Sequence, residues 1–241
     1  MQQSNILAII PARKGSKRLK NKNIIKLKNK PLFLWTLDLA INSKLFDDIY
    51  VSTDSKKIFN LSQKKKCLCP RLRKPSLAKD NITLIDVTKS IIKEYEKKIN
   101  KISAVVLLQP TSPFRSFETI KKGIKLFFKN KRKESVVAVS SVKSNPKWCF
   151  KIEGSTMRPY LKKHGYNLQS QKLEKTIAPN GSLFITSPEC LIRRNSFYSK
   201  NPKFIFNKYK YEKLDIDDLN DLYYARAIVK YGIKNFKIRK N

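Results

Sequence analysis

A dense group of cations and hydrogen-bond donors follows the first apolar segment of the chain. The apolar run ends at Pro11, and the turn that follows is rich in cations and backbone donors, among them Arg13, Lys14, Gly15, Ser16, Lys17, Arg18, Lys20, Lys22 and Asn23. A bound triphosphate needs several N–H donors and two or three cations around it. Gly15 permits a tight turn, Arg13 can bind two phosphate oxygens, and Lys17 and Lys22 add point charges. The segment indicates nucleotide binding; the alternative is a solvated basic loop in a lysine-rich chain.

The sequence Gln109-Pro110-Thr111-Ser112-Pro113 follows an apolar run that is typical of a buried strand. Ligands of open α/β sheets bind beyond the carboxyl ends of the strands. The amide of Gln109 can donate and accept there, which suits a base or a sugar hydroxyl. Pro110 and Pro113 restrict the turn. The alternative is an ordinary turn at a strand end.

Three of the chain's 18 acidic residues stand close together at Asp215, Asp217 and Asp218. In an extended segment Asp215 and Asp217 point to the same face. Two carboxylates beside a phosphate site are typical of a hard-cation site, here Mg²⁺. The alternative is a helix N-cap with acidic first-turn residues, a role that suits Asp218. The clustering favours the metal interpretation for Asp215 and Asp217.

Alternating strand-like and helix-like segments are expected to position these groups. This pattern predicts an α/β fold with βαβ units and a mostly parallel sheet. The predicted strands are Ile6–Pro11, Asp48–Thr53, Ala104–Gln109, Ser135–Ser140 and Gly181–Thr186. The predicted helices are Pro31–Ser43, Ser55–Lys65, Thr83–Lys98, Phe117–Asn130 and Asp218–Tyr231.

The segment 143–179 interrupts this alternation. It is polar and irregular and contains Gly154, Pro159, Gly165 and Pro179. We expect a lid or dimerisation arm there, inserted into a catalytic domain made of residues 1–142 and 180–241. With such an arm we expect the protein to form a homodimer.

Composition excludes several classes of protein. The 241 residues include 53 Lys and Arg, and the formal net charge is +35. The lysines are spread evenly, so compositional bias explains them as well as a nucleic-acid site does, and no specific nucleic-acid partner is predicted. No apolar run approaches the roughly 20 residues of a membrane span, which predicts a cytoplasmic protein with no membrane partner. The four cysteines are expected to be reduced thiols, and the single histidine, His164, excludes a His-based metal site.

Six motifs in this order resemble the cytidylyltransferases that activate nonulosonic (sialic-type) acids, the CMP-N-acylneuraminate synthetase family. The segments that carry the resemblance are IIPARKGSKRLKNKNI, VSTDS, RKPSLAKDNITLIDV, LLQPTSPFRS, PNGSLFI and LDIDDLNDL. Each motif is modest alone, and together they cover most of the chain. The resemblance implies a Rossmann-like nucleotidyltransferase fold, similar to glycosyltransferase-A folds, with a small dimerisation extension.

The resemblance also implies substrates and residue roles. CTP is the expected donor, a nonulosonic sugar acid the acceptor and Mg²⁺ the cofactor. Arg13, Ser16, Lys17, Lys22 and Asn23 are expected to hold the CTP phosphates and ribose. Thr83, Lys74 and Asp80 are expected near the nucleotide, with Gln109 near the acceptor. Asp215 and Asp217 are the expected Mg²⁺ ligands, and Arg13, Lys17, Lys22, Gln109 and Asp217 are the expected catalytic residues.

The chain departs from the family pattern at several positions. Arg18 and Lys20 replace a Gly and a Pro, and Lys74 stands where an Arg precedes the proline. Ser170 and Ile177 stand in place of an Arg and a Tyr of the acceptor region, where Lys147 or Lys151 is a candidate replacement cation. The alternatives are therefore a 3-deoxy-manno-octulosonate cytidylyltransferase or a CTP-binding paralogue without turnover. All three interpretations require Lys22 and Asp217 to meet in space.

Overall fold

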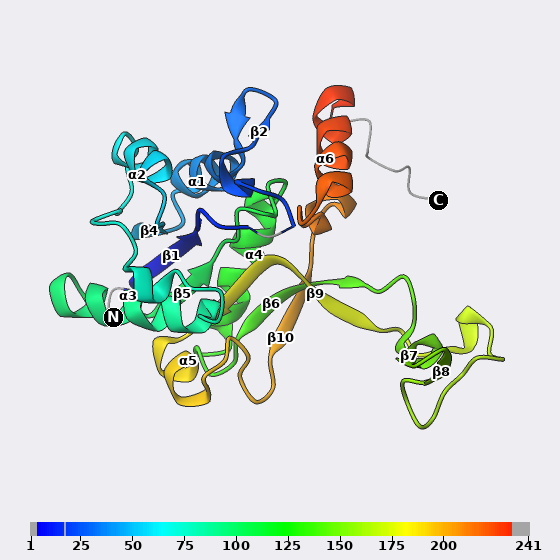
Figure 1. Cartoon of the computed structure of the whole chain (residues 1–241). Coiled ribbons are helices and arrows are strands. Elements are labelled where there is room, and N and C mark those ends of the chain that lie inside the picture. Colours follow the sequence, from blue (N-terminus) through cyan, green and yellow to red (C-terminus); the bar gives the residue numbers. More distant parts are fainter. Residues whose placement is uncertain (1–3, 17, 233–241) are drawn as a thin grey trace.

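The structure, a computed structural model, describes residues 4–16 and 18–232 of the chain. Within these residues a six-stranded sheet has the order β10-β6-β9-β5-β1-β4 (Figure 1). Its strands are β1 (Ile6–Pro11), β4 (Asp48–Ser52), β5 (Ala104–Leu107), β6 (Val136–Ser141), β9 (Ile177–Thr186) and β10 (Lys203–Phe206). Two short hairpins, β2 (Lys26–Leu27) with β3 (Lys30–Pro31) and β7 (Phe150–Glu153) with β8 (Thr156–Pro159), lie outside it.

The sheet is mostly parallel, as the sequence predicts. Strand β1 pairs in parallel with β4 and β5, and β10 pairs in parallel with β6. Strand β9 is antiparallel to both β5 and β6 and joins the two halves. It begins at Ile177, four residues before the predicted strand, because Ile177–Pro179 pairs with Val139–Ser141. The strand therefore crosses the domain boundary expected at residue 179.

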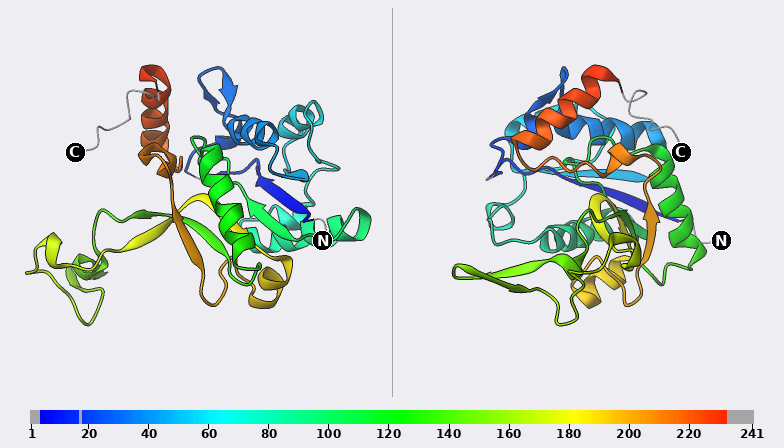
Figure 2. Two further views of the ribbon diagram at one scale, coloured as in Figure 1. Left: turned by 180° about the vertical axis from the view of Figure 1, so that it is seen from behind. Right: turned by 90° about the vertical axis from the view of Figure 1, so that its right-hand side faces the viewer.

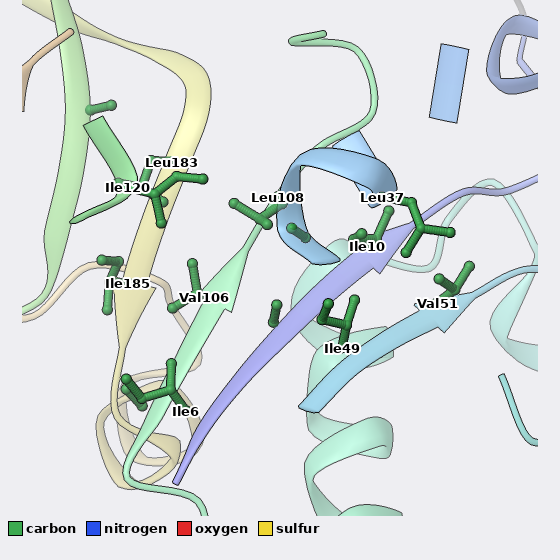
Figure 3. Close-up of a cluster of buried hydrophobic side chains, with 14 of the residues drawn as sticks. Ile6, Ile10, Leu37, Ile49, Val51, Val106, Leu108, Ile120, Leu183 and Ile185 are labelled. Carbon is green, nitrogen blue, oxygen red and sulfur yellow. The ribbon is translucent and has the colours of Figure 1, made fainter. Parts of the chain in front are cut away.

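Helices cover both faces of the sheet (Figure 2). They are α1 (Leu32–Ser43), α2 (Lys56–Gln63), α3 (Leu84–Lys98), α4 (Phe117–Lys129), α5 (Pro188–Arg194) and α6 (Leu219–Tyr231). Alternate residues of β1 serve the two faces. Ile10 packs in the cluster that contains residues of α1, α2 and α4 (Figure 3). Ile9 packs with residues of α3 and α5. Burial of β1 on both faces explains its continuous apolar sequence.

Side chains that cap helix N-termini explain where several helices begin. Ser55, Thr83, Ser116, Ser187 and Asp218 each accept a hydrogen bond from a backbone N–H of the first turn. Such caps satisfy donors that have no partner within the helix. Thr83 and Asp218 form full capping boxes with the aspartates three residues on. The predicted cap at Asp218 is confirmed, and this role leaves Asp215 and Asp217 for another purpose.

Residues 142–176 carry the β7–β8 hairpin away from the sheet (Figures 1 and 2). We call this segment the arm. Within the arm, the rings of His164 and Phe150 stack on Tyr166, with ring centroids 4.1 and 4.6 Å away. Every residue of β7 is exposed.

Among the described residues, no helix combines the length and apolarity that crossing a membrane requires. The cytoplasmic location stays a prediction. All four cysteines are free thiols, as the sequence predicts.

Candidate active site

A cavity of about 460 Å³ lies beyond the carboxyl end of β1, which contributes Pro11 to its lining. Eight of the predicted site residues line it: Arg13, Ser16, Lys22, Asn23, Asp80, Thr83, Gln109 and Asp217. These residues come from four separate stretches of the chain, and the fold brings them to one place. Lys74 and Asp215 are not part of this lining, and Lys17 lies outside the described residues.

The basic turn after β1 is closed by Asn23. Lys22 and Asn23 belong to a single 3₁₀ turn, Lys22–Ile24, which follows Asn21 in the left-handed conformation at φ 57°. Asn23 is buried, and its Nδ2 donates to the carbonyl oxygen of Arg13 at 2.8 Å. Its Oδ1 is also buried and has no hydrogen-bond partner in the described part of the chain. A buried acceptor of this kind suits a ligand hydroxyl at the cavity wall.

The basic turn near the start of the chain contacts the late acidic segment at Asp217. Lys22 Nζ lies 2.8 Å from Asp217 Oδ1, and Arg18 Nη2 lies 2.7 Å from Asp217 Oδ2. Partial burial on its own raises the pKa of the Asp217 carboxyl, but the bound Lys22 and Arg18 bring it below the ordinary value. We call Arg18, Lys22 and Asp217 the carboxylate side of the cavity. The predicted meeting of the cationic turn and the late carboxylate is confirmed.

Asp215 lies behind this side, against the backbone of β9. A Cβ at Gly181 would lie 3.0 Å from Asp215 Oδ2, and Gly181 has a φ of +76°, so only glycine suits this position. Burial raises the pKa of the Asp215 carboxyl, and the charge of Asp217 raises it further. Asp215 Oδ1 is buried and has no hydrogen-bond partner among the described residues. A cation at this position would satisfy this buried oxygen.

The pair Asp215 and Asp217 fits a hard divalent cation. Mg²⁺ is usually held by one or two carboxylates, with waters and substrate phosphates as the other ligands. Among residues 4–16 and 18–232, no group of three or more His, Cys, Asp or Glu residues could hold a metal ion. Two carboxylates beside the basic turn match the first kind of site and not an all-protein cage.

A buried arginine supports the turn that carries Gln109. The side chain of Arg115 donates from Nη2 to the Gln109 carbonyl at 2.9 Å and from Nη1 to Thr36 Oγ1 at 3.2 Å, and from Nε to the Ser182 carbonyl. Burial lowers the pKa of Arg115 to about 9, against the opposing charges of Glu212 and Asp215. The sequence motifs do not indicate a role for Arg115, because an arginine after a strand usually reaches solvent.

A second part of the lining is mostly apolar. Ile82, Leu84 and Val87 stand at the start of α3, and we call them the apolar side of the cavity. Thr83 lies between Ile82 and Leu84 in the sequence, and its hydroxyl hydrogen-bonds within the capping box with Asp86. A flat apolar wall with polar groups at its rim suits a nucleobase.

Arg73, and not Lys74, enters the cavity next to the apolar side. The backbone N–H of Arg73 donates to Thr53 O at 2.6 Å, and its guanidinium donates to Ser52 Oγ and Ser52 O at 3.0 and 2.8 Å. Burial lowers the pKa of Arg73. Lys74 instead faces a neighbouring open groove beside Arg71. The sequence signal was present, since two cations precede Pro75, but spacing did not show which one turns inward.

The cavity lining also contains an ion pair. Arg13 Nη1 lies 3.0 Å from Asp80 Oδ1. None of Lys147, Lys151, Ser170 or Ile177 contributes to the cavity lining within the described subunit. Lys151 lies instead 3.1 Å from Glu153 on the arm.

Comparison with known proteins shows the class of this chain. The profile of the cytidylyltransferase family matches residues 7–180, which is more than half of the sequence. The chain therefore belongs to the cytidylyltransferase family and is a nucleotidyltransferase by class. The predicted family and enzyme class are confirmed.

Several curated proteins resemble the chain. It is 36% identical over 215 residues to a CMP-N,N'-diacetyllegionaminic acid synthase of Legionella pneumophila, covering 88% of this chain and 90% of the relative. It is 33% identical over 219 residues to an N-acylneuraminate cytidylyltransferase of Streptococcus agalactiae, covering 89% of this chain but 51% of the relative. A pseudaminic acid cytidylyltransferase of Campylobacter jejuni is 27% identical over 224 residues, covering 93% and 96%. The chain thus spans about half the length of its streptococcal relatives.

Solved structures confirm the fold class. A CMP:2-keto-3-deoxy-manno-octonic acid synthetase complexed with CTP matches with a TM-score of 0.67 at 13% identity, covering 95% of this chain and 99% of that one. A 4-diphosphocytidyl-2C-methyl-D-erythritol synthase of Anaerococcus prevotii matches with a TM-score of 0.64 at 16% identity, covering 94% and 99%. At these identities the likeness concerns the nucleotidyltransferase fold alone.

Proposed function

We propose that this protein transfers the cytidylyl group of CTP to the anomeric hydroxyl of a nonulosonic sugar acid. The products are a CMP-sugar and pyrophosphate. The observation that carries the proposal is the contact between Lys22 and Asp217 at 2.8 Å, in a cavity shared with Arg13 and Gln109. The curated relatives support the acceptor class, because their names refer to legionaminic, pseudaminic and N-acylneuraminic acids.

The cavity suggests how the substrates are divided among its residues. Arg13, Ser16, Lys17, Lys22 and Asn23 bind the phosphates and ribose of CTP. Thr83, Asp80 and the apolar side hold the nucleoside, with Arg73 in the place expected for Lys74. Gln109 contacts the acceptor, and Arg115 fixes the turn that presents it.

Asp215 and Asp217 are the proposed ligands of the divalent cation, which we propose to be Mg²⁺. The orphaned Oδ1 of Asp215 supports this assignment. When bound, the ion would neutralise phosphate charge and favour departure of pyrophosphate. The protein's own part is to hold Asp217 ionised beside Lys22 and Arg18 and to keep both carboxyl groups close to the basic turn.

The reaction needs alignment more than covalent participation by the protein. The acceptor oxygen attacks the α-phosphorus in line; the bond from that phosphorus to the bridging oxygen breaks, pyrophosphate leaves, and the hydroxyl proton passes to solvent. Arg13 and Lys22 oppose the charge that develops on the phosphates. One preorganised donor in such a site contributes about 3–4 kcal/mol to lowering a barrier.

The proposed dimerisation segment is residues 143–179, which contain most of the arm, beside a catalytic domain of residues 1–142 and 180–241. Three of its apolar side chains, Ile152, Met157 and Tyr160, are 85%, 65% and 65% exposed. Exposed apolar side chains grouped on one element are typical of an interface. A homodimer through the arm would cover them.

The test is a pyrophosphate-release assay with CTP, Mg²⁺ and a panel of sugar acids: N-acetylneuraminic, legionaminic, pseudaminic and 3-deoxy-manno-octulosonic acid. We expect release with a nonulosonic acid. Replacing Lys22 with Ala should reduce it at least 100-fold, and Asp217→Asn should remove the Mg²⁺ dependence. Lys26→Ala, which removes an exposed lysine nearby, is the matched control.

Each other outcome has a distinct meaning. Release only with 3-deoxy-manno-octulosonic acid would assign the alternative acceptor. Tight CTP binding without release from any acid would indicate a paralogue without turnover. Absence of CTP binding by the wild-type protein would overturn the proposed function.

A further inference from the structure

Both oxygens of Asp217 are already held by cations. Lys22 Nζ contacts Oδ1 at 2.8 Å, and Arg18 Nη2 contacts Oδ2 at 2.7 Å. The carboxylate therefore has no oxygen without a charged partner. Because each oxygen already lies next to a positive charge, a divalent ion that binds Asp217 is repelled by these side chains and competes with them for the carboxylate.

The two ion pairs differ in burial. The side chain of Lys22 is 13% exposed, whereas that of Arg18 is 69% exposed. Ion pairs with an exposed member are weak, because water solvates the separated charges nearly as well. Water cannot solvate a separated Lys22 in the same way, because its side chain is buried. Arg18 is therefore the partner that a competing cation displaces.

A displaced Arg18 would stay close to the ligand. It lines the same cavity as Arg13 and Ser16, which are the proposed phosphate contacts. A guanidinium binds two phosphate oxygens at once and stays protonated throughout the working pH range. A phosphate oxygen of the nucleotide is thus the natural second partner for this side chain.

We propose that Arg18 is an exchangeable partner of Asp217. It holds the carboxylate before a divalent ion binds, and it transfers to a phosphate oxygen of the nucleotide when the ion takes its place. The inference rests on the proposed function, which makes Asp217 a metal ligand. Arg18 then couples the two binding events, since the ion releases the arginine that the nucleotide uses.

The first test measures binding of Mn²⁺ alone to the full chain, by the electron paramagnetic resonance signal of the free ion. Arg18→Gln removes the competing charge and should bind Mn²⁺ about two- to fivefold more tightly than wild type. Lys20→Gln is the control, because Lys20 is an exposed cation of the same turn and forms no ion pair with any described residue. Equal affinities for wild type and Arg18→Gln, or an equal gain in Lys20→Gln, would overturn the proposal.

The second test measures CTP binding by calorimetry, once with saturating Mn²⁺ and once with EDTA. Arg18→Gln should weaken binding about tenfold with the metal and leave it unchanged without the metal. An equal loss in both conditions would make Arg18 an ordinary phosphate contact and refute the exchange. Wild-type protein that binds neither CTP nor Mn²⁺ would refute the proposed function, whereas normal binding with no effect of Arg18→Gln refutes only the exchange.

Discussion

The two sides of the cavity are assembled in different ways. The apolar side comes from neighbouring residues at one helix start, Ile82, Leu84 and Val87, which a local capping box holds in place. The carboxylate side joins Lys22 to Asp217 across 195 positions of sequence. Arg115 and Glu212 are both buried, and the charges of Glu212 and Asp215 act on Arg115. One side therefore depends on local sequence and the other on the completed fold.

The largest effect should follow from replacing Arg115 with Leu. The change removes the Arg115 donor from the Ser182 carbonyl and one of the hydrogen bonds that the Gln109 carbonyl accepts, the other coming from the Ser112 N–H. It also leaves Glu212 without the nearby positive charge. Breaking a buried charge arrangement costs about 3–5 kcal/mol. Urea unfolding measures the loss, and Arg115→Lys should recover part of it.

Arg71 is an exposed arginine whose replacement can be compared with that of the buried Arg115. It forms a 2.6 Å ion pair with Glu94, and its side chain is 43% exposed. Arg71→Leu should cost less than about 1 kcal/mol because exposed pairs are weak. Losses of similar size at Arg71 and Arg115 would mean that the buried network contributes nothing special.

The next effect concerns Gly181, which packs against Asp215. Alanine there would place its Cβ 3.0 Å from Asp215 Oδ2 at a φ of +76°. Backbone strain of this kind costs about 1–3 kcal/mol, and Mn²⁺ binding should weaken because the carboxylate must shift. Gly154→Ala is the control: its φ is +61°, but nothing lies within 4 Å of the new Cβ. It should lose stability only, and weakened Mn²⁺ binding in both variants would contradict the role of Asp215.

Local sequence rules predicted the regular elements well. Strand Ile6–Pro11 has the predicted bounds, and the helix predicted over Phe117–Asn130 ends one residue earlier, at Lys129. Periodicity and capping residues determine such elements. Strand β10 was missed because only Ile205 of its four residues is buried and its partner β6 is distant in sequence. Helix α5 and the two hairpins were missed because they are short: α5 has seven residues, the strands of β2–β3 have two each, and those of β7–β8 have four each.

The site was predictable in its residue types but not in its orientations. Spacing located the basic turn and the late carboxylates, and family resemblance gave them roles. Sequence spacing did not show whether Arg73 or Lys74 enters the cavity, because the hydrogen bonds of Arg73 to Ser52 of β4 determine this. Nor did it find Arg115, which is buried only because β9 brings Ser182 beside it.

A smaller effect is expected on the apolar side, from Thr83→Ala. This change removes the N-cap of α3, which costs about 1 kcal/mol. Ser116→Ala removes the corresponding cap of α4 and should cost a similar amount. Both losses appear in urea unfolding, whereas Mn²⁺ affinity should stay at the wild-type value in each. If Thr83→Ala alone weakens Mn²⁺ binding, the two sides are not independent.

The smallest expected effects are on how stability depends on pH. Asp215, next to the carboxylate side, and Asp86, next to the apolar side, should contribute to stability with opposite pH dependences. Burial raises the pKa of Asp215, so its stabilising contribution is present below the unfolded pKa of about 3.9 and is lost as pH rises through the folded value. Hydrogen bonds from Thr83 lower the pKa of Asp86, so its contribution is present above about 3.9 and is lost as pH falls through the folded value.

Thermal unfolding in EDTA at neutral pH and near pH 4 separates the two carboxyls. At neutral pH, Asp215→Asn should raise the unfolding midpoint relative to wild type, because the buried charge is gone, and the gain should shrink toward pH 4. Asp86→Asn should lower the midpoint at neutral pH, and its deficit should shrink only at more acidic pH. Shifts of the same sign in both variants would show that Asp215 is stabilised as an ion even without a metal, and the carboxylate side would then need another source of positive charge than Lys22 and Arg18.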